Sequence, residues 1–84
     1  MVFAKVSPVW YEVKDRVAYV TLNRPNKGNA LNEEMHQELN RTWHRINEDE
    51  DVWVVVLQGA GDDFCVGEDL DEIAEAYRQD TEVQ

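Results

Sequence analysis

The stretch GAGDDFCVGEDL, residues 59–70, decides how this chain folds, because it joins a strand pattern to a helix pattern. The run before it, Val52 to Leu57, is apolar at every position, which is typical of a strand covered on both faces in a parallel sheet. After the stretch, apolar residues recur at helical spacing, at Leu70, Ile73, Ala74 and Tyr77. We therefore predict a loop between a strand that ends near Gly59 and a following helix.

Gly67 and Glu68 are predicted to lie where this helix begins. Acidic residues cluster here, and a helix N-terminus carries a partial positive charge that favours them. The N–H groups of a first helical turn lack intrahelical acceptors, and a preceding glycine lets a ligand approach the backbone closely. The junction is therefore predicted to bind a carbonyl oxygen or another anion.

The chain before this stretch predicts a β-hairpin, a loop and a helix. Residues 9–13 and 17–22 are β-rich and flank a polar turn without glycine, and residues 22–29 contain proline, glycine and asparagines typical of a loop. A helix should follow from Leu31 to near Asn47 with Asn32 as its N-cap. Its predicted core face consists of Leu31, Met35, Leu39, Trp43 and Ile46. The polar tail, residues 78–84, is predicted to be frayed.

The length of 84 residues suits one domain, but the predicted elements are too few for the apolar strand at 52–57. A strand covered on both faces needs several strand–helix units around it. We therefore predict an incomplete fold. The missing layers would come from a longer parent chain, a second polypeptide or neighbours in an oligomer.

Charge and composition exclude several partners. With 8 basic and 18 acidic residues the formal net charge is −10, which opposes binding to nucleic acid or to an anionic membrane. No run of about 18 apolar residues is present, and residues 1–8 lack the apolar core of a secretory signal, so we predict a cytoplasmic protein. The single cysteine, Cys65, is predicted to be a small core side chain.

Other binding motifs fail on spacing. In a G-x-G-x-x-G fingerprint that starts at Gly59, the third glycine would fall at Phe64, and no P-loop lysine follows Gly67. The acidic residues lack the spacing of an EF-hand, and His36 and His44 are too far apart along one helix for a shared metal ion, so no metal site is predicted. Both histidines are expected to be exposed. The loop from Arg24 to Asn29 remains open between an ordinary turn and a binding loop.

Two segments together carry a family resemblance. Residues 22–31 read L-N-R-P-x-x-x-N-A-L, and residues 56–70 read V-L-x-G-A-G-x-x-F-C-x-G-x-D-L. In combination they strongly resemble the enoyl-CoA hydratase/isomerase, or crotonase, family, with similarity from about Val9 to Ile73. The resemblance implies an α/β fold, the ββα spiral of the ClpP/crotonase type, of which residues 1–84 would form the N-terminal part of a single domain.

The resemblance also implies a site. An acyl-CoA thioester would lie between the two segments, and the backbone N–H of Glu68 would be one of two donors that hold its carbonyl oxygen as an enolate develops. CoA is then part of the substrate, and no separate cofactor is implied. Family members often carry a small residue where Glu68 stands, which leaves open whether its side chain points into the acyl pocket. The implied substrate-binding residues are Asn26, Lys27, Gly28, Ala30, Val66, Gly67, Glu68, Asp69 and Leu70.

The family's second oxyanion donor and its acid–base glutamates correspond to positions beyond residue 84. The resemblance therefore implies an enoyl-CoA hydratase when complete, with isomerase and thioester hydrolase chemistry left open, and an 84-residue chain that is inactive alone. A noncatalytic binding or assembly module is the alternative. The remainder of the fold or a second polypeptide is the expected partner, and assembly as a trimer or hexamer is the expected oligomer.

Overall fold

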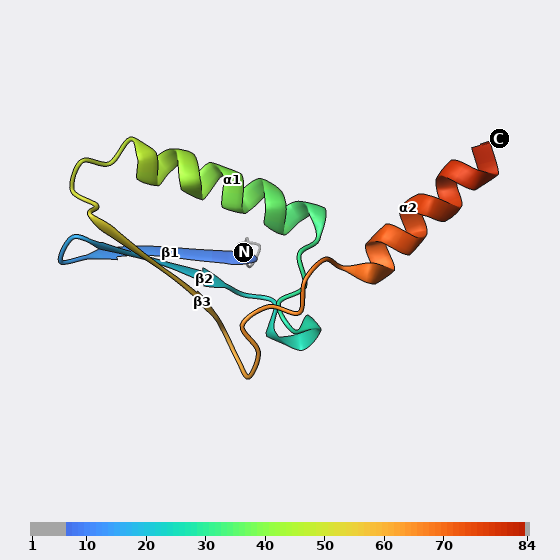
Figure 1. The fold of residues 1–84 in the computed structure, drawn as a ribbon, viewed down its shortest axis with the longest axis horizontal. Helices are drawn as coiled ribbons and strands as arrows, with labels where there is room; N and C mark the ends of the chain where they lie inside the picture. Colours follow the sequence, from blue (N-terminus) through green and yellow to red (C-terminus); the bar gives the residue numbers. More distant parts are fainter. Residues whose placement is uncertain (1–6, 84) are drawn as a thin grey trace, which may run out of the picture.

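The computed structural model describes residues 7–83, which form a three-stranded sheet with one helix on it and a second helix beyond the last loop (Figure 1). The predicted order of hairpin, loop, helix, strand, loop and helix is confirmed. Residues 1–6 lie outside the described residues. They belong to the segment that is predicted to lack the apolar core of a secretory signal. The elements are β1 (Val9–Lys14), β2 (Val17–Leu22), the 3₁₀ helix η1 (Pro25–Lys27), α1 (Glu33–Asn47), β3 (Val54–Gly59) and α2 (Leu70–Val83).

The hairpin of β1 and β2 is antiparallel, with Val9 opposite Leu22 and Lys14 opposite Val17. Its turn consists of Asp15 and Arg16, both left-handed at φ 50° and 71°. A two-residue turn of this kind usually carries Asn-Gly, because glycine adopts positive φ without steric cost. Here the turn forms without glycine, which explains why its sequence is a weak hairpin signal.

The helix α1 crosses over to β3, which pairs in parallel with the other edge of β2, so the strand order is β1-β2-β3. The predicted N-cap is confirmed, since the Asn32 side chain accepts a hydrogen bond from the Met35 N–H at 2.9 Å. The strand β3 begins two residues later than the apolar run and ends at Gly59, as predicted. Its carboxyl end therefore leads directly into the loop at 60–69.

The core lies between α1 and the hairpin. Met35 packs there with three buried strand residues, Val9, Val20 and Leu22. The prediction that Trp43 belongs to this core is wrong, because its side chain is 38% exposed. Met35 and Thr42, seven residues apart, share the buried line of α1, and the next residue is turned about 100° away from it. Trp43 therefore lies on the flank of the helix.

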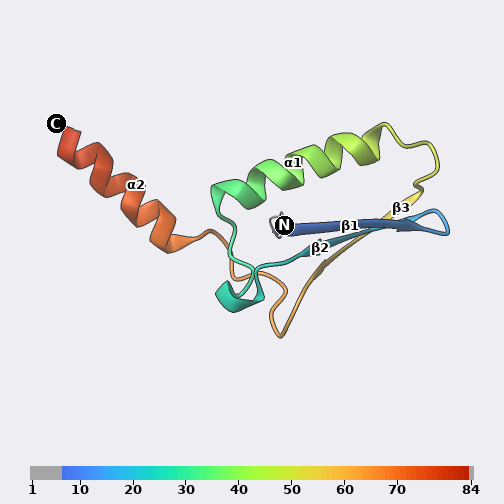
Figure 2. The same ribbon diagram turned by 180° about the vertical axis from the view of Figure 1, so that it is seen from behind.

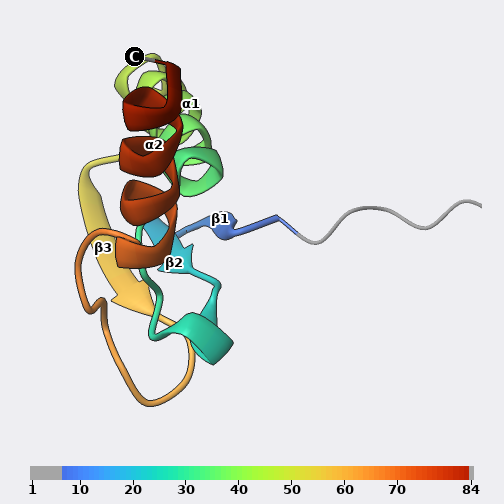
Figure 3. The same ribbon diagram turned by 90° about the vertical axis from the view of Figure 1, so that its right-hand side faces the viewer.

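β3 and α2 present apolar side chains that residues 7–83 leave uncovered. Val54 is 54% exposed and Leu57 43%, although their sequence predicts burial on both faces. The helix α2 runs on past the end of the sheet, as Figure 2 shows from behind, and in Figure 3 both helices lie on one side of the strands. It stays helical through Val83, including most of the segment predicted to be frayed. None of the helices within residues 7–83 is long and apolar enough to cross a membrane.

Candidate functional site

The two motif segments lie side by side. The Val66 N–H donates to the Gly28 carbonyl at 3.0 Å, and the Leu31 N–H donates to the Gly67 carbonyl at 2.8 Å. The Asp69 N–H in turn donates to the Leu31 carbonyl at 3.0 Å. These bonds make an isolated parallel bridge between Leu31 and Glu68, so residues distant in sequence form one local structure.

The bridge determines where the Glu68 N–H points. In a parallel bridge one residue bonds to the two neighbours of its partner, and the partner's own N–H and C=O point to the other side. Here Leu31 bonds to Gly67 and Asp69, so the Glu68 N–H points away from Leu31. Within residues 7–83 this N–H donates to no other group. It is a backbone donor that its neighbours hold in place and that no described group occupies.

The predicted helix start at Gly67 and Glu68 is wrong, because α2 begins at Leu70. Asp69 is the capping residue: its Oδ1 accepts from the Glu72 N–H at 3.1 Å, and its carbonyl accepts from the Ile73 N–H at 3.1 Å. Glu68 therefore precedes the first turn. Its N–H owes its orientation to the bridge and to Gly67, whose φ of 103° favours glycine.

Asn29 joins the first motif loop to the second. Its side chain is completely buried and its backbone is left-handed at φ 58°. Oδ1 accepts from the Arg24 N–H at 2.8 Å, while Nδ2 donates to the Ala60 carbonyl at 2.9 Å and the Asp63 carbonyl at 2.8 Å. Gly59 permits this approach, since a Cβ there would lie 2.4 Å from the Phe64 carbonyl oxygen. The loop after β3 is thus closed around one amide side chain.

A second link is the ion pair of Arg24 and Asp69. The Arg24 Nη1 lies 3.2 Å from Asp69 Oδ2 and also donates to the Ala30 carbonyl at 2.6 Å. Both side chains are largely buried, at 18% and 14% exposed. The pKa of the Asp69 carboxyl lies below its ordinary value of 3.8, chiefly because the Glu72 N–H donates to it. Burial opposes this shift in pKa, and Arg24 adds to it.

Asp69→Asn tests this link. We expect the free energy of unfolding of the variant to fall less than that of wild type as the pH is lowered. A carboxyl whose pKa is lowered by folding contributes stability above its ordinary pKa and loses it as the pH falls through the lowered value. The variant should therefore be less stable than wild type at pH 7, and the difference should shrink as the pH falls below 3.8. Urea unfolding from pH 3 to 7 measures this, with the exposed neighbour substitution Asp71→Asn as control. Parallel stability curves for Asp69→Asn and wild type would contradict the link.

A groove of about 290 Å³ follows the edge where the two segments meet. Six predicted site residues line it together with Asp71, namely Lys27, Ala30, Val66, Glu68, Asp69 and Leu70. The predicted residues Asn26, Gly28 and Gly67 do not line it. Gly28 instead lies against Val66, whose Cγ1 would be 2.9 Å from an added Cβ. Larger hollows of about 500 and 480 Å³ lie near Trp10 and Tyr11 on the sheet, and no predicted site residue lines them.

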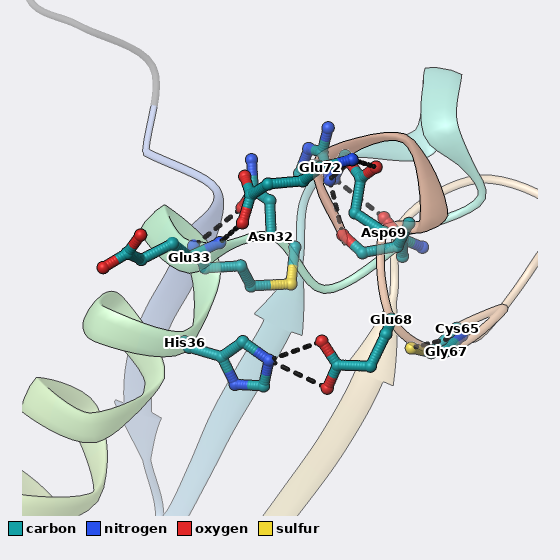
Figure 4. Close-up of polar contacts among 12 residues, drawn as sticks. Asn32, Glu33, His36, Cys65, Gly67, Glu68, Asp69 and Glu72 are labelled. Carbon is teal, nitrogen blue, oxygen red and sulfur yellow. Dashed lines mark hydrogen bonds and ion pairs between the residues drawn. The ribbon is translucent and has the colours of Figure 1, made fainter. Parts of the chain in front are cut away.

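The Glu68 side chain points toward α1, where it meets His36 (Figure 4). The His36 Nε2 lies 3.0 Å from both carboxylate oxygens of Glu68. Both side chains are about half exposed, so the prediction of an exposed His36 is confirmed, but its partner was not foreseen. The neighbouring Glu72 carboxylate accepts from the Glu33 N–H at 2.8 Å and thereby ties the starts of α1 and α2 together.

Cys65 supports the loop that precedes Glu68. It is partly buried against the core, and its Sγ accepts from the Gly67 N–H at 3.4 Å. Within residues 7–83 no group of three histidine, cysteine or acidic side chains could hold a metal ion. The chemistry that the site offers is a fixed backbone donor in a residue that lines a groove, suited to an oxygen atom that carries negative charge.

The family model of enoyl-CoA hydratase/isomerase matches residues 12–84. Over 64 residues the chain is 48% identical to (E)-benzylidenesuccinyl-CoA hydratase of Thauera aromatica, covering 75% of this chain and 25% of that protein. Over 67 residues it is 42% identical to a probable enoyl-CoA hydratase, EchA14, of Mycobacterium tuberculosis, covering 80% and 26%.

A solved structure shares the fold. The enoyl-CoA hydratase/isomerase from Xanthobacter autotrophicus Py2 superposes with a TM-score of 0.81 at 40% identity, covering 87% of this chain and 27% of that chain. The chain thus spans about a quarter of the length of the relatives that it matches.

Proposed function

Because the chain belongs to the enoyl-CoA hydratase/isomerase family, with the α/β crotonase fold of its N-terminal portion, we propose that it forms this part of an enoyl-CoA hydratase. The reaction is the addition of water across the 2,3-double bond of an acyl-CoA thioester. The chain contributes one donor of the oxyanion hole and one wall of the substrate groove.

The orientation of the Glu68 N–H carries this proposal. Glu68 lines the groove, and no group among residues 7–83 accepts from its N–H. As the enoyl group is hydrated, negative charge develops on the thioester oxygen, and a fixed donor at that oxygen stabilises the transition state more than the ground state. The bridge to Leu31 fixes the donor before substrate arrives.

The same groove suits the CoA portion of the substrate. Lys27 is the basic side chain in the groove lining, and its ammonium can pair with phosphate, whereas Arg24 is already bound to Asp69. We place the CoA path along Asn26, Lys27, Gly28 and Ala30 on one side and Val66 to Leu70 on the other. A local cation matters because the formal charge of the chain is −10.

Catalysis needs groups that residues 7–83 do not bring to the groove: a second oxyanion donor and the glutamates that transfer protons. We propose that the remainder of the crotonase fold, or a second polypeptide, supplies them and covers the exposed apolar faces of β3 and α2. This chain alone is then inactive. We also expect assembly as a trimer or hexamer and a cytoplasmic location.

An assay with crotonyl-CoA tests the proposal. The intact protein, meaning this chain with any polypeptide that completes its fold, should hydrate crotonyl-CoA to 3-hydroxybutyryl-CoA, and the 84-residue chain alone should not. Butyryl-CoA, which has no double bond, serves as the control that binds without turnover. Binding of both thioesters without turnover by the intact protein would favour a binding module instead. Release of free CoA would indicate a thioester hydrolase, and conversion of a 3-enoyl-CoA would indicate an isomerase.

A further inference from the structure

Glu68 poses an electrostatic problem for the proposed site. The residue whose N–H is to receive a developing oxyanion also carries a carboxylate, and this residue lines the groove. Two negative charges in a partly desolvated site repel one another, so a carboxylate turned toward the thioester oxygen would raise the barrier. The function proposed above therefore requires that this side chain be held elsewhere or that its charge be offset.

The structure contains a group placed for this task. His36 lies in the first turns of α1, and its Nε2 lies 3.0 Å from each oxygen of the Glu68 carboxylate (Figure 4). The imidazole is carried by a helix whose start is fixed twice, by the Asn32 cap and by the bond from Glu33 to Glu72. It is thus positioned by a regular element, which holds geometry better than a loop does.

The other charged groups at the groove do not contact the Glu68 carboxylate. Asp69 is bound by Arg24, so its charge is already compensated. Asp71 is exposed and adds negative charge. Lys27 lines the groove from η1, and no ion pair joins it to Glu68 within the described residues. His36 is the group in contact with the Glu68 carboxylate.

We infer that His36 is a positioning residue for the oxyanion site. It draws the Glu68 carboxylate toward α1 and, when protonated, offsets its charge, which leaves the Glu68 N–H facing the substrate oxygen. The inference rests on the proposed function, because it requires that this N–H bind the thioester. It also gives a role to His36, although the exposed position of this residue on α1 does not by itself suggest one.

The test is a double-mutant cycle in the intact protein with crotonyl-CoA. We expect His36→Ala to lower kcat about tenfold to a hundredfold, because the carboxylate is then free to turn toward the oxyanion. KM should change less than about threefold, since His36 does not line the groove. Glu68→Gln removes the carboxylate charge, so adding His36→Ala to it should cost little, and the double variant should have the kcat of Glu68→Gln alone.

His44→Ala is the matched control, an exposed histidine two turns further along α1. Melting temperatures should match for all variants, because exposed ion pairs contribute little to stability. Equal activity of His36→Ala and His44→Ala, or the same fold loss in kcat when His36→Ala is added to wild type and to Glu68→Gln, overturns the inference. Neither result contradicts the proposed function. The proposed function fails if the wild-type intact protein does not hydrate crotonyl-CoA, or if loss of the Glu68 N–H does not change kcat.

Discussion

Glu68→Pro is expected to lower the kcat for crotonyl-CoA hydration by about 10² to 10³-fold, the usual cost of removing one oxyanion donor. Proline has no backbone N–H. Within residues 7–83 the Glu68 N–H makes no internal hydrogen bond, and the bridge uses the Gly67 carbonyl and the Asp69 N–H. The substitution therefore deletes the donor and leaves the hydrogen bonds of the bridge available.

Glu68→Ala is the matched control, because it truncates the same side chain and keeps the N–H. We expect its kcat to stay within about threefold of wild type. Steady-state kinetics of both variants separate the backbone from the side chain at this position. If both variants have the same kcat, whether high or low, the N–H is not the donor that we propose.

Asn29→Asp is expected to destabilise the intact protein by about 2–4 kcal/mol. The amide nitrogen of Asn29 donates to two carbonyls, those of Ala60 and Asp63, at a site without solvent exposure. An ionised aspartate places charge against both carbonyls, and a protonated one has a single hydrogen for the two. Urea denaturation measures the loss in the free energy of unfolding.

Asn26→Asp provides the comparison for this prediction. Asn26 belongs to the same loop but is exposed in η1, so the same change in chemistry should cost less than about 0.5 kcal/mol. A loss of similar size in the two variants would mean that the added charge, and not the buried amide, is responsible. Activity should fall with Asn29→Asp as well, because the amide closes the loop that leads from β3 to Glu68.

Local patterns in the sequence predict the elements of this fold well. Strand alternation, the Asn32 cap and the turn residues act over a few positions, so the hairpin, α1 and β3 follow from them. The start of α2 does not. An acidic run before a helix fits several registers, and the choice of Asp69 as the cap depends on the bridge between Leu31 and Glu68, which are distant in sequence.

The site residues also differ in whether local sequence predicts them. The paired motifs predict which segments meet, and the structure brings them together. The contact of His36 with Glu68 joins two elements and has no local signal. The left-handed backbone of Asn29 has a local signal, since asparagine is favoured at such positions. Its burial has none, because it depends on how the loop after β3 folds around it. The spacing of Trp43 from Met35 and Leu39 predicts one core face, but the buried line of α1 runs through Met35 and Thr42, which leaves Trp43 on the flank.

The bridge at Leu31 has a consequence for substitutions at position 68. Because the donor at position 68 belongs to the backbone and is oriented by bonds on either side, its geometry does not depend on the side chain that position carries. In the proposed site, substitutions there, other than proline, change the surroundings of the acyl group while the donor stays in place. In the proposed function, substitutions at position 68 are thus a route to different acyl groups that keeps the oxyanion donor.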